Sequence, residues 1–204
     1  MLIIGLTGSI GMGKSTLAGH LRARGIPVLD ADAEVHKLYA GEAVPVIEAT
    51  FPGTTDGGKV DRQRLTAALA SDPSGFQRLE AIVHPLVRAA ERRFLHQAHA
   101  QGAKLAVLEI PLLFETGGDR LMDVTILASA PAAVQLERVL QRDGMTPEKF
   151  AMILSRQTSD AEKRAKASFV VDTGLSLPAT FASLDTIIDG LAGREGTAFA
   201  RHWA

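Results

Sequence analysis

A glycine-rich segment near the amino terminus holds the residues best placed to do chemistry. From Gly8 the chain reads GSIGMGKS, so Gly8 is followed after four residues by Gly13, Lys14 and Ser15. This spacing satisfies the phosphate-loop pattern, in which backbone N–H groups surround an anion and glycines let the main chain come close to it. The lysine would reach the outer phosphates of a nucleotide, and the serine hydroxyl would bind Mg²⁺.

The elements on either side of this segment are those that the pattern requires. Residues 2–6, LIIGL, form a continuous apolar run typical of a strand that is buried on both faces. Residues 14–25 place Leu17 and Leu21 on one helical face, and Gly25 is positioned to end the helix. A chance match in a turn is disfavoured because the pattern, the strand and the helix coincide. We predict that a nucleoside triphosphate is held by Gly8, Gly11, Met12, Gly13, Lys14, Ser15 and Thr16.

A pair of carboxylates follows the next apolar run. Residues 26–30, IPVLD, end at Asp30, and Asp32 comes two positions later. Strands of an open parallel sheet direct their carboxyl ends to the ligand crevice, so both carboxylates are expected beside the phosphate loop. One of them can orient Mg²⁺ through water while the other accepts a proton from an attacking hydroxyl. The alternative is that either aspartate caps the following helix.

The arrangement of apolar runs predicts an α/β fold. Runs of strand length recur at residues 104–110, 123–128 and 168–172, and helical patterns separate them. Parallel strands need such crossovers, so the fold class expected is a parallel sheet flanked by helices.

One long region interrupts this alternation. Residues 32–102 contain no convincing strand, and helix starts are predicted at Asp72 and at His84, each of which precedes a proline. This region is therefore expected to be a helical insertion. Residues 52–59, PGTTDGGK, are expected to form a polar, flexible loop within it.

Composition excludes several classes of protein. The chain has 204 residues, a formal net charge of −1 and no cysteine. The near-neutral charge disfavours a nucleic-acid partner, and the lack of cysteine excludes disulfides and thiolate chemistry. No signal peptide and no apolar run of about 18 residues is present. We expect a cytoplasmic protein of one domain with insertions, without a membrane partner, that is a monomer or a weak homo-oligomer.

A phosphate loop alone leaves kinases, GTPases, ATPase motors and binding modules open. The chain has no N-K-x-D sequence of the kind that reads guanine in GTPases, and most large ATPase machines are longer than 204 residues. Small-molecule kinases fit this size.

Six segments in order, GLTGSIGMGKST, IPVLDADAEVHKL, IVHPLV, EIPLLFE, QRDGMT and SRQTSDAEKRAKASFVVDTG, resemble the dephospho-coenzyme A kinases over residues 2 to 174. Members of that family transfer the γ-phosphoryl group of ATP to the ribose 3′-hydroxyl of dephospho-coenzyme A, the last step of coenzyme A synthesis. The resemblance implies ATP and Mg²⁺ as cofactors. It also implies a phosphate-loop core at residues 1–35, 101–137 and 167–204, a helical substrate-binding domain at 36–100 and a lid at 138–166.

The same resemblance implies roles for single residues. Asp32 would be the general base and Lys14 a catalytic cation, and a second set would lie near the acceptor: His84, Pro111, Leu112, Leu113 and Glu115. The alternative for His84 is a plain helix cap. The chain departs from the usual family loop G-G-I-G-S-G-K at Ser9 and Met12, both at free positions of the pattern.

The charged region 137–166 supplies candidate lid residues. Helix caps are predicted at Thr146 and, as a capping box, at Ser159 and Glu162. Guanidinium groups stabilise the charge that develops during phosphoryl transfer. Of the arginines Arg138, Arg142, Arg156 and Arg164, we predict that Arg142 and Arg156 are catalytic. The alternative for each arginine is a solvated helix face with ordinary ion pairs.

Three questions stay open. Glu109 ends a predicted strand where phosphate-loop enzymes often hold an acidic magnesium partner, but the position varies in the family that the chain resembles, so we leave it out of the predicted site. A nucleoside or nucleotide kinase of the same fold is the alternative activity, and a nucleotide-dependent switch or binding module is the alternative class. Residues 194–204 suggest no function.

Overall fold

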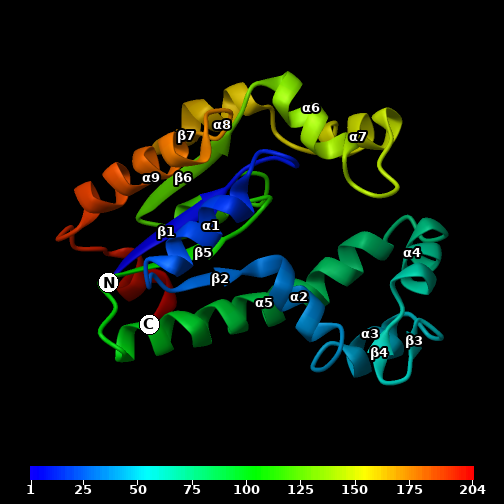
Figure 1. Cartoon of the computed structure of the whole chain (residues 1–204). Helices are drawn as coiled ribbons and strands as arrows, with labels where there is room; N and C mark the ends of the chain where they lie inside the picture. The colour runs from blue at the N-terminus through cyan, green and yellow to red at the C-terminus, as the bar shows by residue number, and fades with distance from the viewer. The chain divides into compact units, whose positions relative to one another are not determined.

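A five-stranded sheet forms the centre of the first of two compact units in the computed structural model, which describes residues 1–204 (Figure 1). The first unit comprises Met1–Leu29 and Leu95–Ala204. In spatial order the strands are β2 (Val28–Asp30), β5 (Leu105–Glu109), β1 (Leu2–Thr7), β6 (Val124–Ser129) and β7 (Phe169–Asp172). All five lie within the apolar runs or extend them by one residue, which confirms the predicted strands and fold class.

The middle strand, β1, sets the position of the phosphate loop. β1 pairs in parallel with β5 and with β6, so Leu6 lies opposite Glu109 in one pair and opposite Ile126 in the other. Every residue of β1 and of β6 is buried, as continuous apolar runs in a covered parallel sheet should be. The chain that leaves β1 after Thr7 therefore emerges between the carboxyl ends of β5 and β6.

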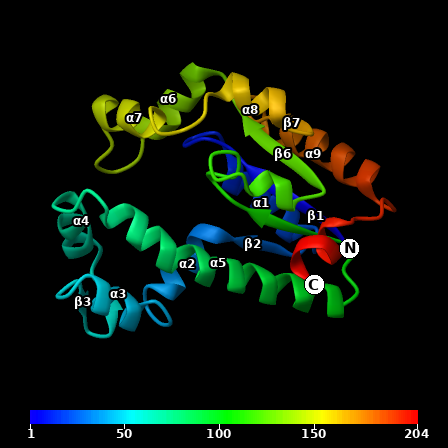
Figure 2. The same ribbon diagram turned by 180° about the vertical axis from the view of Figure 1, so that it is seen from behind.

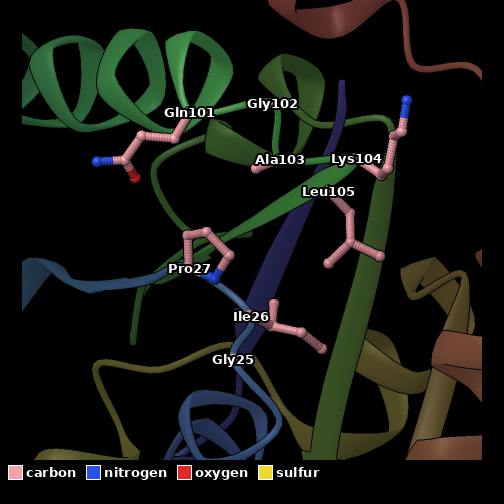
Figure 3. Close-up of a pocket in the computed structure, with 8 residues that line it drawn as sticks. All are labelled: Gly25, Ile26, Pro27, Gln101, Gly102, Ala103, Lys104 and Leu105. Atoms are coloured by element: carbon pink, nitrogen blue, oxygen red, sulfur yellow. The ribbon is translucent and has the colours of Figure 1, made fainter.

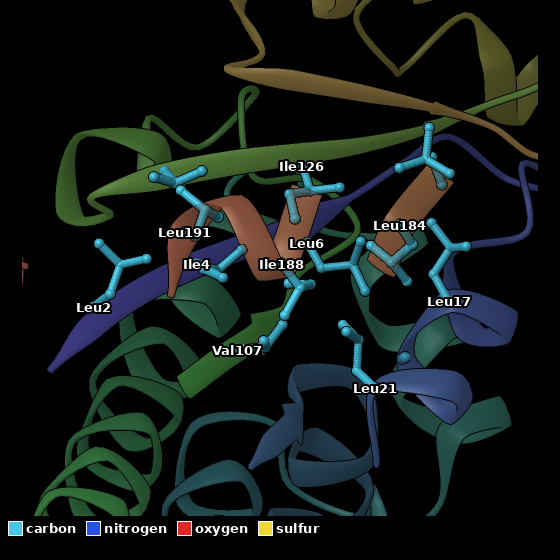
Figure 4. Packing of buried hydrophobic residues seen from close by; sticks show 14 residues of the cluster. Leu2, Ile4, Leu6, Leu17, Leu21, Val107, Ile126, Leu184, Ile188 and Leu191 are labelled. Atoms are coloured by element: carbon cyan, nitrogen blue, oxygen red, sulfur yellow. The ribbon is translucent and has the colours of Figure 1, made fainter. Parts of the chain in front are cut away.

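Helices α1 (Lys14–Ala23) and α9 (Leu177–Leu191) cover the sheet with an apolar layer. In Figure 4 their leucines and isoleucines meet the side chains of the strands: Leu17, Leu21, Leu184, Ile188 and Leu191 against Leu2, Ile4, Leu6, Val107 and Ile126. Helix α1 ends as predicted. Gly25 has φ of +76°, its N–H donates to the carbonyl of Arg22 at 2.9 Å, and the N–H of Ile26 donates to the carbonyl of Leu21 at 3.1 Å.

The segment between β6 and β7 is helical, with α6 (Ala132–Leu140), α7 (Pro147–Leu154) and α8 (Asp160–Lys166). Figure 2 shows α6 and α7 beyond the carboxyl end of β6. The predicted caps are confirmed. Thr146 accepts a hydrogen bond from the N–H of Lys149, and Ser159 and Glu162 make both bonds of a capping box.

The last residues of the chain pack against the start of the sheet. Asp123 accepts hydrogen bonds from the N–H groups of Thr197 and Ala198 through one carboxylate oxygen, and from that of Ile3 through the other. Trp203, in the π-helical turn η2 (Phe199–Trp203), is 1% exposed and donates its indole N–H to the carbonyl of Leu121 at 3.0 Å. Leu121 ends the short 3₁₀ helix η1 (Gly118–Leu121).

The second unit, Asp30–Phe94, is built mainly of helices around its own apolar core. It contains α2 (Ala31–Leu38), α3 (Val44–Thr50), α4 (Arg62–Ala70) and most of α5 (Gly75–Ala100). The predicted helical domain, residues 36–100, overlaps this unit. None of the helices of the chain combines the length and the apolarity needed to cross a bilayer.

Two local expectations in this unit are wrong. The segment expected to be a flexible loop is an antiparallel hairpin of β3 (Thr55–Asp56) and β4 (Lys59–Val60), in which Gly57 and Gly58 supply the positive φ angles of the turn. These strands have two residues each, too few to show alternation in the sequence. Helix α5 does not start at His84, because it runs through Pro85 without a break. A proline removes only one helical hydrogen bond, and 26 residues of amphipathic helix tolerate that loss.

Asp72 lies just before α5. Its carboxylate accepts hydrogen bonds at 2.8 Å from the N–H and from the hydroxyl of Ser74, and α5 begins one residue later.

Candidate active site

The phosphate loop of the first unit has the backbone geometry that the glycine spacing predicts. Gly11 and Gly13 have φ of +77° and +79°, in the left-handed region that favours glycine. A Cβ at Gly8 would lie 2.8 Å from the carbonyl oxygen of Ala128, and one at Gly11 would lie 2.5 Å from a methyl group of Val139. A side chain at either glycine would therefore push the loop out of place.

The loop ends on the amino terminus of α1. Gly13 is the N-cap and makes no side-chain cap hydrogen bond, so the N–H groups of Lys14 and Ser15 stay open to an anion, while that of Thr16 donates to the Gly13 carbonyl at 3.1 Å. Lys14 and Ser15 are the first two residues of this helix.

Both residues that depart from the usual family loop have partners. The hydroxyl of Ser9 accepts a hydrogen bond from the Lys163 ammonium at 3.0 Å. The buried thioether of Met12 accepts one from the N–H of Ala130 at 3.1 Å, and the Thr173 hydroxyl donates to the Met12 carbonyl at 2.7 Å. The side chains of Ser9 and Met12 thus each bond to a residue outside the loop.

Two glutamine side chains hold the loop between those points. The Gln135 amide of α6 donates to the carbonyl of Ile10 at 2.8 Å, and the side-chain oxygen of Gln157 accepts from the N–H of Ile10 at 3.3 Å. Gln157 lies directly after Arg156, so the segment that carries this arginine is bonded to the phosphate loop.

A buried carboxylate accepts hydrogen bonds from both the lysine and the serine of the phosphate loop. Glu109, at the end of β5, has no exposed side-chain surface. Its Oε1 accepts hydrogen bonds from Lys14 Nζ at 2.7 Å and from the Ser15 hydroxyl at 3.1 Å, and its Oε2 accepts one from Arg22 Nη2 at 3.2 Å. No cluster of three or more His, Cys, Asp or Glu side chains forms a metal site in the structure. The Ser15 hydroxyl and the Glu109 carboxylate nevertheless fit Mg²⁺, which prefers a few protein oxygens together with phosphate oxygens.

Glu115, a predicted substrate residue, binds two residues of the predicted lid, Thr158 and Lys163. Its Oε1 accepts hydrogen bonds from Lys163 Nζ at 2.8 Å and from the N–H of Thr158 at 2.9 Å, while its Oε2 is buried without a partner. Lys163 has no exposed surface, so this single cation joins Glu115 to Ser9 of the phosphate loop.

The other predicted substrate residues differ in exposure. Leu112 is 40% exposed and His84 is exposed on α5. The carbonyl of Pro111 accepts a hydrogen bond from the Thr7 hydroxyl at 3.1 Å. Leu113 is fully buried, and a Cβ on Gly5 would come within 2.7 Å of its side chain, so Leu113 packs in the interior.

The two aspartates of the DAD sequence are in different positions. Asp30 accepts a hydrogen bond from the N–H of Ala33 at 3.1 Å, so the helix-cap alternative holds for Asp30. Asp32 lies in the first turn of α2 with an exposed side chain whose carboxylate has no hydrogen bond. The role of Asp32 as general base stays a prediction.

The four arginines of the charged region separate into two pairs. Arg138 donates to the hydroxyl and the carbonyl of Thr173, at 3.3 and 2.7 Å, and Arg164 donates to the Ser129 hydroxyl at 2.9 Å. The side chains of Arg142 and Arg156 are exposed and make no hydrogen bond or ion pair. The two predicted catalytic arginines are therefore the two that are available to a ligand.

Two cavities lie outside the site around the phosphate loop. One, of about 370 Å³, is lined by Gly25–Pro27 and Gln101–Leu105, at the amino ends of β2 and β5 and thus at the opposite edge of the sheet from the phosphate loop (Figure 3). The other, of about 320 Å³, lies at the carboxyl ends of β6 and β7, where Asp160, Arg164 and Asp172 line it.

A model of a known protein family matches residues 2–178 of the chain, and its description is dephospho-CoA kinase. The chain belongs to the dephospho-CoA kinase family. A relative named dephospho-CoA kinase from Rhodopseudomonas palustris (strain ATCC BAA-98 / CGA009) is 54% identical over 192 residues, 94% of this chain and 96% of the relative. One of the same name from Rhizobium etli is 56% identical over 194 residues, 95% of this chain and 96% of the relative.

Solved structures agree with this family. TT1252 from Thermus thermophilus has a TM-score of 0.80 at 37% identity and covers 94% of this chain and 98% of its own. Dephospho-CoA kinase from Campylobacter jejuni has a TM-score of 0.70 at 26% identity, with coverage of 93% and 96%. Shikimate kinase from Acinetobacter baumannii, at 18% identity and a TM-score of 0.53, shares the fold alone. The predicted family is thereby confirmed.

Sequence reasoning missed four side chains that bond to the phosphate loop, those of Gln135, Gln157, Lys163 and Thr173, and it missed Arg22, which bonds to Glu109. None of them belongs to the phosphate-loop pattern, and each acts through a contact with a residue far away in the chain. The position of Glu109 could have been predicted from the sequence. An acid at the carboxyl end of a strand that pairs with β1 lies beside the phosphate loop and the start of α1.

Proposed function

We propose that the protein transfers the γ-phosphoryl group of ATP to the ribose 3′-hydroxyl of dephospho-CoA and so produces CoA and ADP in the last step of CoA biosynthesis. The observation that carries this proposal is the family match over residues 2–178, with a phosphate loop whose geometry suits a nucleotide. The family makes the protein a phosphotransferase with an alcohol acceptor.

We further propose how the residues divide the work. The open N–H groups of α1 and the Lys14 ammonium bind the phosphates, and the Ser15 hydroxyl and Glu109 carboxylate would hold Mg²⁺. When bound, Mg²⁺ neutralises charge on the phosphate oxygens. Asp32 accepts the proton of the 3′-hydroxyl, and Arg142 and Arg156 close over the transferring group. Catalysis is then positioning together with electrostatic stabilisation.

ADP release tests the reaction directly. Purified protein is given MgATP with dephospho-CoA, with nucleosides, with nucleoside monophosphates, or with no acceptor. We expect rapid ADP formation with dephospho-CoA only. ADP formation with a nucleoside or its monophosphate would favour the alternative kinase activity, and ATP binding without acceptor-dependent ADP release would favour a binding module.

Asp32→Asn tests the proposed general base. We expect turnover to fall by about a hundredfold or more, because a positioned base contributes about 10²–10⁴ in rate, while ATP binding stays nearly the same. The matched control is Glu34→Gln, which alters an acid two positions away in α2 and is expected to keep full turnover. Wild-type turnover in Asp32→Asn would remove Asp32 from the chemistry.

A further inference from the structure

Glu109 is shared by two cations that come from the same helix. Lys14 Nζ and Arg22 Nη2 approach different oxygens of its carboxylate, at 2.7 and 3.2 Å, and they start from opposite ends of α1. The Glu109 side chain has no exposed surface, whereas 42% of the Arg22 side chain is exposed. Arg22 is thus a partly exposed cation that pairs with a buried carboxylate.

The bond between Lys14 and Glu109 competes with the binding of Lys14 to the phosphates of a nucleotide. The lysine ammonium is bonded to Glu109 in the structure, yet the proposed function requires it at the phosphates. A fully buried carboxylate that loses its cation is strongly unfavourable, because the interior solvates charge poorly. If Lys14 were the only cation on Glu109, a nucleotide that arrives without Mg²⁺ would have to break a buried ion pair in order to bind.

Arg22 removes this conflict. Its guanidinium is always charged, and it occupies the Glu109 oxygen that Lys14 does not use. We infer that Arg22 is a positioning residue, which keeps Glu109 neutralised and so leaves Lys14 able to bind the phosphates of ATP. This inference rests on the proposed function, since it presumes a nucleotide in the phosphate loop.

Binding of ATP in the presence of EDTA, measured by calorimetry, tests the inference without catalysis or Mg²⁺. We expect Arg22→Gln to raise the dissociation constant about tenfold or more, since close charge pairs commonly couple at that strength. Arg22→Lys keeps the charge and should restore most of the affinity. Arg24→Gln is the matched control, because Arg24 lies at the same end of α1 but pairs with Asp185 and Asp189.

A second substitution separates positioning from mere stabilisation. Glu109→Gln in the Arg22→Gln background removes the charge that needs compensation, so the double variant should bind ATP more tightly than Arg22→Gln. A purely structural role for Arg22 predicts a lower melting temperature with unchanged ATP affinity, and that result would overturn the inference. Weak binding that Glu109→Gln does not relieve would overturn it as well.

ATP binding by the wild-type protein separates a failure of the proposed function from a failure of the role of Arg22. Wild-type protein that does not bind ATP at all overturns the proposed function. Wild-type protein that binds ATP as tightly as Arg22→Gln leaves that function intact and overturns only the role of Arg22.

Discussion

The phosphate loop and the predicted lid differ in how their functional groups are held. In the loop, Ser9, Ile10 and Met12 each have partners outside it, and Lys14 rests on Glu109. In the predicted lid, residues 138–166, the guanidinium groups of Arg142 and Arg156 have none. The loop is therefore organised for an anion before one arrives, as electrostatic catalysis requires. Arg142 and Arg156 have no partner in the protein, so we expect their contribution to be confined to the ligand-bound state.

The largest effect is expected when both arginines without a partner, Arg142 and Arg156, are replaced. We expect Arg142→Ala/Arg156→Ala to lower turnover by about 10³- to 10⁵-fold, the range known for arginines that stabilise a transferring phosphoryl group. The ATP dissociation constant and the melting temperature should change little, because neither side chain has a partner. Lys166→Ala, an exposed cation at the end of α8, is the control. A single-turnover rate equal to that of wild type would contradict the proposed role.

The next test addresses the buried cation at the base of the predicted lid. Lys163→Met should lower the free energy of unfolding by about 3 kcal/mol, because it leaves the Glu115 carboxylate without its cation. Lys163→Met/Glu115→Gln should recover much of this loss. Chemical denaturation measures both variants, with Lys166→Met as control. A single variant as stable as wild type would show that the Lys163–Glu115 ion pair does not stabilise the fold.

A buried carboxylate with fewer partners gives a third test. Burial raises the pKa of Glu91 from 4.5 to about 7, although Arg88, at 3.4 Å, acts in the opposite direction. The folded protein therefore holds this proton more tightly than the unfolded chain. The free energy of unfolding should fall as pH rises from about 4.5 to about 7, by roughly 3 kcal/mol in total.

Glu91→Gln should abolish this pH dependence, and Glu80→Gln, an exposed position of α5, should not. Denaturation at pH 5 and pH 8 measures all three proteins. Equal slopes for wild type and Glu91→Gln would mean that Glu91 keeps its ordinary pKa.

The smallest effect is expected in a comparison of two glycine variants, at positions with nearly the same φ. Gly11→Ala and Gly102→Ala each force an alanine into the left-handed region, at a cost of about 1–2 kcal/mol in stability. Only at Gly11 does the new Cβ meet neighbours, on α6, whereas nothing lies within 4 Å at Gly102. We expect ATP affinity to fall about tenfold in Gly11→Ala alone. Equal affinity in both variants would mean that the exact course of the loop is unimportant.

Features that depend on neighbouring residues could be predicted from the sequence, and contacts between distant residues could not. The strands, the glycine loop and the caps at Thr146 and Ser159 follow from local rules, and the structure bears them out. Hydrogen bonds and ion pairs between residues far apart in the sequence do not follow from local rules. Arg22 and Glu109 are 87 positions apart, and Ser9 and Lys163 are 154 apart, so only the topology of the sheet brings them together.

The misses in the helical unit have a related cause. Pro85 satisfies the local rule for a helix start, yet the apolar face of α5 continues on both sides of it. Packing along that face outweighs the preference of one residue. Asp30 shows the reverse case, since a local cap explains its position and leaves the assignment of Asp32 to experiment.

The docking of the last residues on Asp123 has a practical consequence for anyone who shortens this chain. The same carboxylate fixes Thr197, Ala198 and Ile3, and Trp203 is sealed beneath η1. Truncation before Thr197 would expose an indole-sized apolar hollow at the site of Trp203. It would also remove Thr197 and Ala198 from Asp123 and so loosen the hold of Asp123 on Ile3 in β1, the strand that leads into the phosphate loop. Losses of nucleotide binding in such truncated proteins would then originate five residues of chain before Gly8, or roughly 17 Å at about 3.3 Å per strand residue.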